Sequence, residues 1–365
     1  MFCDTIFKMT KKILLSAVII VLVFLGSWFI LGGENKCPHS FKPIMVAGPY
    51  YTGPLLDAHL HLPTKIKTIS EVAAKTGNPI SLWGSKLPLG DKLSLDYLKC
   101  LFDREGMYGA YGFHLFTKYY MNAEVDMAKK IEKKHPGMIT HFLMPTIIND
   151  SINPDIDKIA QVLDDNPGLF RGIGELKMYD GKEPDDPYVL GFIELAKKHN
   201  LIVMMHPFDN HKKGIEKIVR QYPEVTFLLH GIVEDIGPAV VKNNINWLDK
   251  LMANNKNVYY SVDGGLHIYG FQKSHVGKTI PKEEMLPYLK ASFKEQLQTD
   301  LGYYQKIIEK YPNRFLRGTD RFHITHFDQE ISALLDEYTR AFIGRLSPSV
   351  QEKFAHLNAD VLLEK

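Results

Sequence analysis

The chain has 365 residues, of which 45% are hydrophobic and 24% charged, so it can bury a core and is neither disordered nor of low complexity. Its 44 basic and 42 acidic residues leave a net charge of +2, which gives no overall field to recruit nucleic acid or anionic lipid. Three scattered cysteines exclude a disulfide scaffold and a CxxC-type zinc site. The 15 histidines are the unusual count, and their positions carry the functional interpretation.

The first apolar segment is a candidate membrane anchor. Residues 13–31 (ILLSAVIIVLVFLGSWFIL) carry no charge and come close to the roughly 20 residues that a helix needs to cross a bilayer. Lysines precede this run, which predicts a cytoplasmic N-terminus (residues 1–12) and a main body on the periplasmic or extracellular side. A cleaved signal peptide is the alternative, but its apolar region is usually shorter and ends in small residues. We therefore expect an uncleaved transmembrane helix.

Residues 32–50 contain several Gly and Pro residues and predict a linker between the anchor and the body. If the body lies outside a reducing cytosol, Cys37 and Cys100 could pair. Their irregular placement favours two unpaired thiols instead.

From residue 51 to the C-terminus, short apolar runs alternate with amphipathic stretches. The runs predict eight strands: Leu55–Leu60, Gly109–Leu115, Ile139–Thr146, Phe170–Leu176, Leu201–His206, Thr226–His230, Val258–Val262 and Phe315–Gly318. Helices are predicted between them, with apolar residues three and four apart, at 121–135, 154–165, 186–200 and 303–312. This alternation over residues 51–365 predicts an α/β fold, a (β/α)8 TIM barrel.

A doubly wound open sheet would give the same alternation of strands and helices. It would lack polar residues at the C-terminal end of almost every strand. The chain has no GxGxxG motif opening a helix after the first strand and no GxxxxGK[ST] motif. The absence of both motifs from the sequence disfavours a nucleotide-binding fold.

The first predicted strand ends in Asp57-Ala58-His59-Leu60-His61. Because side chains of a strand alternate between its two faces, we expect Asp57, His59 and His61 to project to the same side. Two imidazoles in this arrangement can hold one divalent ion, and the carboxylate can orient a ring from behind. An HxH pair alone is a weak signal that also fits two solvated histidines. Its position directly after an apolar strand favours the ligand pair.

Four further strands end in residues that bind metals. Glu175 ends the fourth, and its partner is either a metal ion or Lys177 on the same face. His206 and His230 end the fifth and sixth; each alone would fit a core histidine, but two in succession favour ligands. Asp320 follows the eighth, either as a helix N-cap or as a ligand and proton acceptor. The C-terminal ends of barrel strands converge on one face, which predicts a single centre made of His59, His61, Glu175, His206, His230 and Asp320.

Over residues 54–363 these motifs resemble the amidohydrolase superfamily of metal-dependent TIM-barrel hydrolases. The matching elements are DAHLH, GIGEL, MMHP, LLHG, GTD and the ending LNADVL at 357–362, which is similar to that of the amidohydrolase 2 subgroup. The GIGE strand leans towards the branch that includes TatD-like enzymes. The resemblance implies Zn²⁺ or a similar divalent ion held by the HxH pair and Asp320, with His206 and His230 as further ligands or catalytic groups. Either one ion or two could bind, with Glu175 or Lys177 as the bridge.

This ligand set predicts hydrolytic chemistry. An ion held by imidazoles and a carboxylate lowers the pKa of bound water towards about 7, and Asp320 would accept the water's proton and pass it to the leaving group. With two ions, Glu175 would bridge them, and His206 and His230 would complete the coordination of the second ion. With one ion, His230 would instead stabilise the developing oxyanion.

Further residues are candidates for substrate contacts or for support of the ligands. Asp263 closes the seventh strand, and Arg321 follows Asp320, where it could meet an anionic group or form a salt bridge. The loops at 63–91 and 264–281 should overhang the site. Their aromatic residues, Trp83, Tyr269 and Phe271, would suit a ring-bearing substrate or pack against the barrel.

We therefore expect hydrolysis of an ester, lactone or amide bond in a small molecule. The alternatives are non-oxidative decarboxylation of an aromatic or unsaturated carboxylate and TatD-like phosphodiester cleavage. The near-zero net charge disfavours the last and predicts no nucleic-acid partner, because phosphate backbones are bound largely by Lys and Arg. A membrane-tethered binding protein is a non-enzymatic alternative, which the complete ligand set disfavours. The sequence leaves the oligomeric state open.

Overall fold

The computed structural model describes residues 41–62, 93–148, 150–178, 181–231, 238–263, 280–322 and 324–364. The predicted anchor at 13–31, Cys37 and the aromatic residues of the two overhanging loops lie outside these ranges. Within the described ranges, none of the helices combines the length and the apolar character that a bilayer crossing needs.

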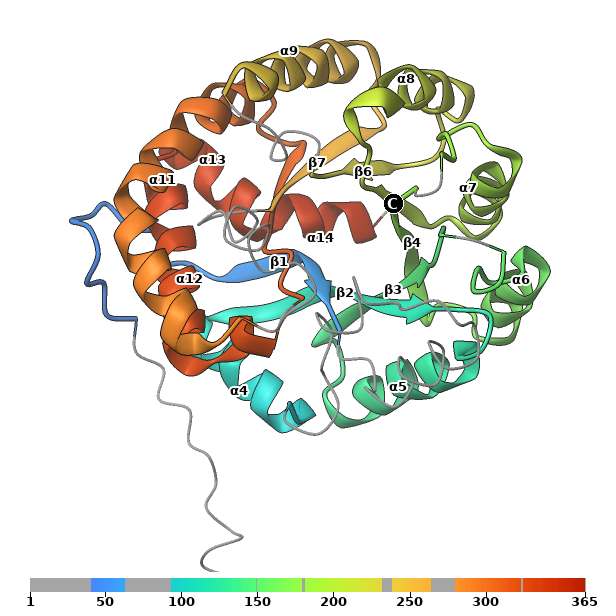
Figure 1. Ribbon diagram of the computed structural model, residues 1–365, viewed down its shortest axis with the longest axis horizontal. Coiled ribbons are helices and arrows are strands. Elements are labelled where there is room, and N and C mark those ends of the chain that lie inside the picture. Colours follow the sequence, from blue (N-terminus) through green and yellow to red (C-terminus); the bar gives the residue numbers. More distant parts are fainter. Residues whose placement is uncertain are drawn as a thin grey trace, which may run out of the picture. The chain divides into compact units, whose positions relative to one another are not determined.

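Eight parallel strands lie side by side in sequence order and form the centre of the molecule (Figure 1). They are β1 (Leu55–His61), β2 (Met107–Phe116), β3 (Ile139–Pro145), β4 (Phe170–Leu176), β5 (Ile202–Met205), β6 (Phe227–Leu229), β7 (Val258–Asp263) and β8 (Phe315–Gly318). The segment after β8 closes the barrel onto β1. There, the Asp320 main-chain N–H donates to the His59 carbonyl (2.9 Å) and the His61 N–H donates to the Arg321 carbonyl (3.1 Å). The predicted (β/α)8 barrel is confirmed.

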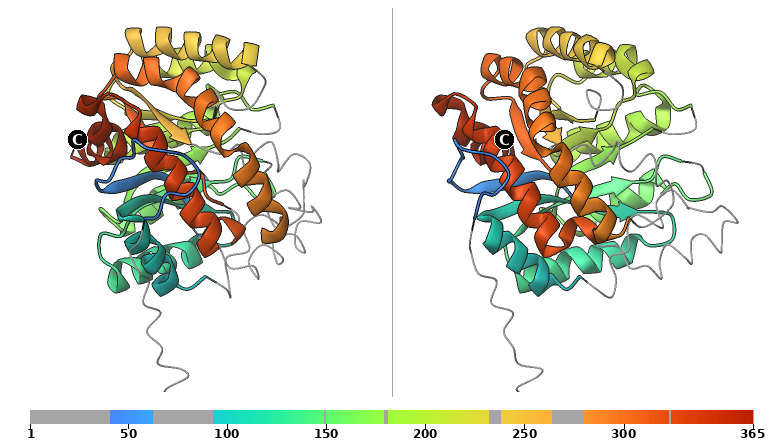
Figure 2. Two further views of the ribbon diagram at one scale, coloured as in Figure 1. Left: turned by 90° about the vertical axis from the view of Figure 1, so that its left-hand side faces the viewer. Right: turned by 60° about the vertical axis from the view of Figure 1, so that its left-hand side comes forward.

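Helices surround the strands and connect each to the next (Figure 2). They are α4 (Leu95–Glu105), α5 (Met121–Lys134), α6 (Ile156–Asp165), α7 (Pro187–His199), α8 (Lys212–Gln221), α9 (Pro238–Asn254), α11 (Lys282–Lys310), α12 (Gln329–Gly344), α13 (Pro348–Glu352) and α14 (Asn358–Leu363). Short 3-10 turns, η1 (Asp209–His211) and η2 (Ile324–Phe327), and a π turn, η3 (Lys353–Leu357), complete the described elements.

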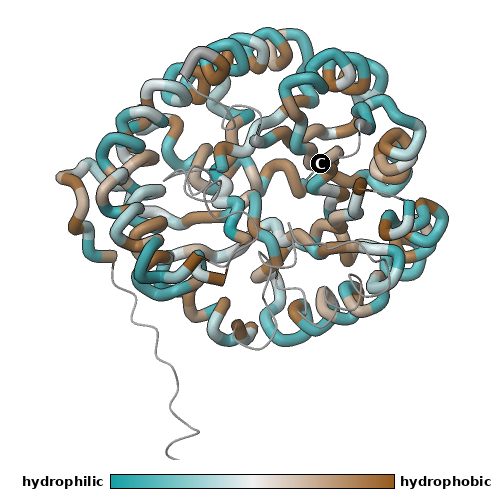
Figure 3. The backbone as a smooth tube through the Cα atoms, viewed as in Figure 1, coloured by the Kyte–Doolittle hydropathy of each residue, from teal (hydrophilic) through white to brown (hydrophobic). Residues whose placement is uncertain are grey.

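The core has two layers, as the alternation of strand side chains requires. The larger layer lies between strands and helices, where apolar positions of the helices alternate with hydrophilic ones (Figure 3). The smaller layer fills the barrel interior and includes Leu56, Tyr111 and Phe142. Helix α14 closes the barrel at the N-terminal ends of the strands, where Tyr111 Oη donates to the Ala359 carbonyl (2.6 Å). The predicted site residues lie at the opposite end of the barrel, at the C-terminal ends of the strands.

Helix α11 is much longer than the helix predicted at 303–312. It begins at Lys282 and contains Pro287, a residue that argues against a helix when only the sequence is considered. Pro287 is the sixth residue of this helix, so it removes one main-chain hydrogen bond, the one that an N–H at this position would donate to the Glu283 carbonyl.

The second half of the predicted linker is hydrogen-bonded to α12 and to Arg345, the residue that follows this helix. The Met45 N–H donates to Glu337 Oε1 (2.7 Å), and Arg345 Nη2 donates to the Ala47 carbonyl (2.8 Å). Cys100, on α4, is disulfide-bonded, so the expectation of an unpaired thiol at this position is wrong.

Candidate metal centre

A bulge in β1 aims the two histidines of the HxH pair into the barrel. The pairing of β1 with β2 shifts register between Asp57 and Leu60, so one extra residue interrupts the alternation of faces. Ala58 packs in the interior layer, and the rings of His59 and His61 follow on the same side, with centroids 4.9 Å apart. The sequence pattern alone gave no signal of this bulge.

Asp57 lies on the other face of β1, so the expectation that it shares a face with both histidines is wrong. Its carboxylate accepts hydrogen bonds from the His59 main-chain N–H (3.1 Å) and the Thr319 hydroxyl (2.5 Å). Asp57 therefore fastens β1 to the segment that carries Asp320 and does not orient an imidazole ring.

Glu175 lies at the centre of the predicted ligands, and its two oxygens face different histidines. Oε2 lies 3.5 Å from His61 Nε2 and 4.0 Å from His59 Nε2. Oε1 lies 2.7 Å from His206 Nδ1 and 3.1 Å from His230 Nε2. All five side chains are buried. The strand-end pattern thus brings together residues from β1, β4 and the ends of β5 and β6.

Asp320 completes the group at its exposed edge. Its Oδ1 lies 2.9 Å from His61 Nε2 and 3.7 Å from His59 Nε2, and its side chain is 24% exposed. The backbone at Asp320 is left-handed (φ 48°), a conformation that Asp adopts more readily than most residues. This turn directs the carboxylate back over β1.

The donor atoms fit a divalent metal ion. A tetrahedral zinc site with bonds of about 2.0–2.2 Å places its donors about 3.3–3.6 Å apart. The contacts of Nε2 of His59 and His61 with Glu175 Oε2 and Asp320 Oδ1 span 2.9–4.0 Å around that value. Nε2 of His59 is buried and has no hydrogen-bond partner among the described residues. Two further groups of potential ligands are Glu175 with His206 and His230, and Asp263 with His59 and His230. Because Glu175 Oε2 also faces His59 and His61, Glu175 could contact both ions if two bind.

The surroundings keep Glu175 ionised. Burial alone would raise its pKa, but the charges of His230 and Lys177 and hydrogen bonds from histidine hold the pKa well below its usual value. A carboxylate that stays negative at neutral pH is the form that binds a cation.

Asp263 lies behind the rings. Its Oδ2 is 3.1 Å from His59 Nδ1 and 2.5 Å from His230 Nδ1, and its Oδ1 accepts a hydrogen bond from the Ser261 hydroxyl (2.7 Å). The sequence placed Asp263 at the site but suggested a substrate contact. The structure places its carboxylate against two imidazoles.

Lys177 and Arg321 differ in their relation to the ligands. Lys177 Nζ lies 5.9 Å from the centroid of the Phe208 ring, and the lysine charge helps to lower the pKa of Glu175. Arg321 is buried, and its Nη1 donates to Glu105 Oε1 on α4 (2.9 Å). The expectation that Arg321 meets an anionic substrate is wrong; the alternative, a salt bridge, is what forms, and it is internal.

Three phenylalanines next to the histidines were not singled out from the sequence. The Phe113 and Phe322 rings lie 4.9 Å from His59 and 6.0 Å from His61, and Phe208 lies 5.7 Å from His206, between centroids. Phe208 and Phe322 each follow a predicted ligand by two positions, a spacing that could have drawn attention to them. They give the site apolar walls.

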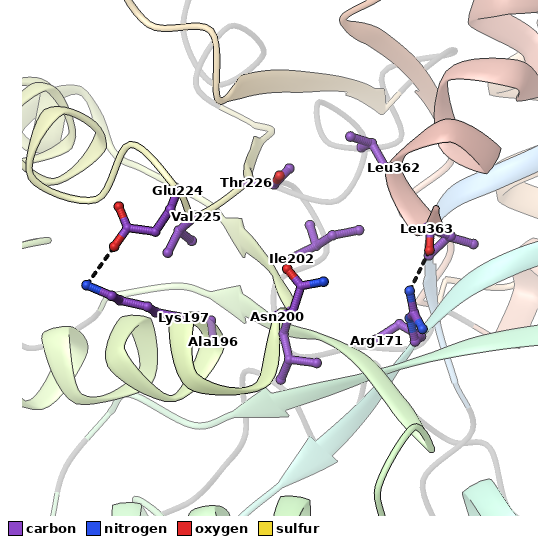
Figure 4. A pocket seen from close by; sticks show the side chains of 11 residues that line it. Arg171, Ala196, Lys197, Asn200, Ile202, Glu224, Val225, Thr226, Leu362 and Leu363 are labelled. Carbon is purple, nitrogen blue, oxygen red and sulfur yellow. Dashed lines mark hydrogen bonds and ion pairs between the residues drawn. The ribbon is translucent and has the colours of Figure 1, made fainter. Parts of the chain in front are cut away.

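A separate cavity of about 120 Å³ opens at the other end of the barrel (Figure 4). Arg171, Ile202 and Leu362 line it, at the beginnings of β4 and β5 and on α14. It contains none of the predicted ligands and is separate from the candidate centre.

Neither a protein-family model nor a curated protein matches the chain. Solved structures do match its fold. An amidohydrolase from Burkholderia multivorans with bound Zn is 12% identical, with a TM-score of 0.55, over 86% of this chain and 99% of the other. A probable 2-pyrone-4,6-dicarboxylic acid hydrolase from Acinetobacter baumannii, with citric acid bound, is 11% identical, with a TM-score of 0.53, over 85% and 99%.

A third similar structure is a 5-carboxyvanillate decarboxylase from Novosphingobium aromaticivorans, complexed with manganese and 4-hydroxy-3-methoxy-5-nitrobenzoic acid. It is 12% identical, with a TM-score of 0.52, over 89% of this chain and 100% of the other. These similar structures thus include an amidohydrolase, a probable hydrolase and a decarboxylase. The chain shares their TIM-barrel fold.

Proposed function

We propose that this chain is a metal-dependent amidohydrolase that cleaves an ester, lactone or amide bond of a small substrate, with Zn²⁺ as the preferred ion. The observation that carries the proposal is the position of Glu175, whose two carboxylate oxygens each lie within 4.0 Å of two histidine nitrogens. Buried imidazoles around a carboxylate are a costly arrangement without a cation, because each polar atom needs a partner.

His59, His61 and Asp320 would hold the first ion with Glu175, and His206 and His230 would hold a second one. When bound, a divalent ion supplies an activated water as nucleophile and polarises the substrate's carbonyl oxygen. Asp320 is suited to accept the proton at the carboxylate oxygen that does not hold the ion and to deliver it to the leaving group, because its side chain is 24% exposed while that of Glu175 is only 3% exposed. The phenylalanine walls limit the access of bulk water.

Non-oxidative decarboxylation of an aromatic or unsaturated carboxylate is the second candidate. A decarboxylase shares the fold, and the Phe208 and Phe322 rings beside the ligands suit a flat substrate. TatD-like phosphodiester cleavage has less support, because the Arg321 guanidinium is paired with Glu105.

A product-resolved screen tests this proposal. The full chain, loaded with Zn²⁺ or Mn²⁺, is incubated with lactones, esters, amides, aryl carboxylates and phosphodiesters, and the products are identified by mass spectrometry. We expect hydrolysis products, and Asp320→Asn should abolish them. Asp96→Asn, at an exposed carboxylate on α4, is the matched control and should keep wild-type turnover. Release of CO₂ would instead favour the decarboxylase function. The absence of turnover with every class of compound would contradict both candidate functions.

The anchor at 13–31 and a periplasmic or extracellular location of the barrel are part of the proposal. The lysines before the apolar run support them, as does the disulfide at Cys100, because disulfides persist mainly in oxidising compartments. The test is to add protease to cells whose plasma membrane is intact and whose outer layers have been made permeable. The protease should digest the barrel, and protection of the barrel by the plasma membrane would contradict this orientation.

A further inference from the structure

We propose that the two residues beside Asp320 in the chain, Thr319 and Arg321, form a clamp that holds the Asp320 carboxylate over β1. Thr319 is bonded to Asp57 on β1, and Arg321 is bonded to Glu105 on α4. Thr319 and Arg321 are positioning residues, because they act through Asp320 and not on the substrate. The inference rests on the proposed function where it treats Asp320 as the proton acceptor. The bonds themselves join residues of this chain only.

The backbone at Asp320 needs support from its surroundings. Its φ of 48° is left-handed, and a residue other than glycine keeps such a conformation only where the structure around it holds it there. The Asp320 N–H donates to the His59 carbonyl (2.9 Å), and the His61 N–H donates to the Arg321 carbonyl (3.1 Å). These main-chain bonds join the turn to β1, and the side chains of the clamp add one bond on each side of Asp320.

Thr319 fastens the turn on the side that follows β8. Its hydroxyl donates to Asp57 Oδ2 (2.5 Å) and also lies 3.3 Å from the His59 carbonyl oxygen. The other oxygen of Asp57, Oδ1, accepts the His59 main-chain N–H (3.1 Å), and Asp57 is fully buried. One buried carboxyl group therefore links the turn to the strand that carries the HxH pair.

Arg321 fastens the turn on the other side. Its guanidinium is buried, and Nη1 donates to Glu105 Oε1 (2.9 Å). The same Glu105 oxygen accepts a hydrogen bond from the Ser332 hydroxyl on α12. Breaking a buried ion pair leaves a charge without its partner, so Arg321 has a strong preference for this position. Asp320 is thus held through both of its neighbours, while its own carboxylate is 24% exposed and lies 2.9 Å from His61 Nε2.

The test compares Thr319→Val with Thr319→Ser in the full chain. Valine has the shape of threonine without the hydroxyl, whereas serine keeps the hydroxyl. Amide hydrogen exchange of the metal-free protein, resolved to single residues, reports on the bond from the Asp320 N–H to the His59 carbonyl. We expect the Asp320 amide to exchange about 10-fold faster in Thr319→Val than in the wild type, and at close to the wild-type rate in Thr319→Ser.

The same two variants are then loaded with zinc and assayed on the substrate found in the product-resolved screen. We expect kcat to fall by about 10²-fold in Thr319→Val, because a displaced proton acceptor slows the reaction, while KM changes little. Thr319→Ser should restore kcat. A loss of general stability alone would change neither the ratio of kcat to KM effects nor the rescue by serine.

Glu105→Gln tests the other side of the clamp, because it keeps the shape of the Glu105 side chain and removes its charge. We expect the His61 amide, which donates to the Arg321 carbonyl, to exchange about 10-fold faster in this variant. Wild-type exchange at the His61 amide would overturn the assignment of Arg321 to the clamp.

Thr146→Val is the matched control. Thr146 is also buried, and its hydroxyl donates to the Ile152 carbonyl (3.2 Å) in the segment that follows β3. This variant should keep wild-type kcat and wild-type exchange at Asp320. Wild-type exchange at Asp320 in Thr319→Val, or an equal change in Thr319→Ser, would overturn the inference. A wild type without turnover would instead refute the proposed function, and the exchange rates of the metal-free protein would still decide whether the clamp exists.

Discussion

The close approach of β8 to Asp263 makes Gly318→Ala a sharp perturbation of the site. The added methyl group would lie 2.3 Å from both Asp263 Oδ1 and Ser261 Oγ, and 3.1 Å from His59 Cβ. Ordinary contacts begin near 3.4 Å, so the carboxylate, the serine or β8 itself must move by about 1 Å, an overpacking that costs about 1–3 kcal/mol of unfolding free energy. A displacement of this size at a positioned group can cost about 10²-fold in rate.

We therefore expect Gly318→Ala to lose about 1–3 kcal/mol of stability in urea unfolding and to lower kcat by about 10²-fold. Gly302→Ala is the matched control, because a Cβ at Gly302 on α11 would contact nothing within 4 Å among the described residues. Ala is the better helix former by about 0.8–1.0 kcal/mol, so this variant should gain stability and keep wild-type kcat. Wild-type kcat and zinc affinity in Gly318→Ala would refute the claim that β8 holds Asp263 in place.

Three further outcomes follow from the site and the core. Asp320→Asn should lower kcat by about 10²–10⁴-fold with an unchanged circular dichroism spectrum, and full activity would exclude Asp320 as the proton acceptor. His59→Ala and His61→Ala should each reduce the bound metal measured by native mass spectrometry; unchanged metal content would exclude the HxH pair as ligands. Burial lowers the pKa of both His114 and His141 to about 3, below the value of about 6.5 in the unfolded chain. As the pH falls from about 6.5 towards 3, the unfolded chain takes up protons at these histidines and the folded chain does not, so stability that is present at neutral pH is lost. The free energy of unfolding should then fall by about 1.4 kcal/mol per pH unit for each proton that the unfolded chain takes up and the folded chain does not. A variant with Phe at both positions should show a weaker dependence of the unfolding free energy on pH. The same pH dependence in both proteins would contradict this explanation.

Much of the fold and most of the candidate ligands could be predicted because the strands are short runs rich in apolar residues, and those that position the ligands end in, or are followed by, a polar residue. His206 and His230 directly follow β5 and β6, and Glu175 lies one residue before the end of β4. In a parallel barrel such ends must converge, so position in the chain predicts proximity in space. The same argument identified Asp320 without any knowledge of its left-handed backbone.

The roles of neighbouring residues could not be predicted, because they depend on single-residue changes in register. The bulge in β1 lies after Asp57 and separates its face from that of the two histidines, and periodicity alone cannot locate a bulge. Arg321 follows a predicted ligand but pairs with Glu105, which lies 216 positions away in the chain. The part of Asp263 in the site likewise depends on its distance from His59, a residue of a different strand.

The most direct test of the central claim is the metal content of the full chain, measured by elemental analysis after zinc loading and removal of free metal. The account predicts one or two divalent ions per chain in the wild type, and the loss of at least one in Glu175→Gln, since Glu175 contacts both groups of histidines. A folded wild-type protein that retains no stoichiometric metal, or a Glu175→Gln variant that retains all of it, would contradict the account.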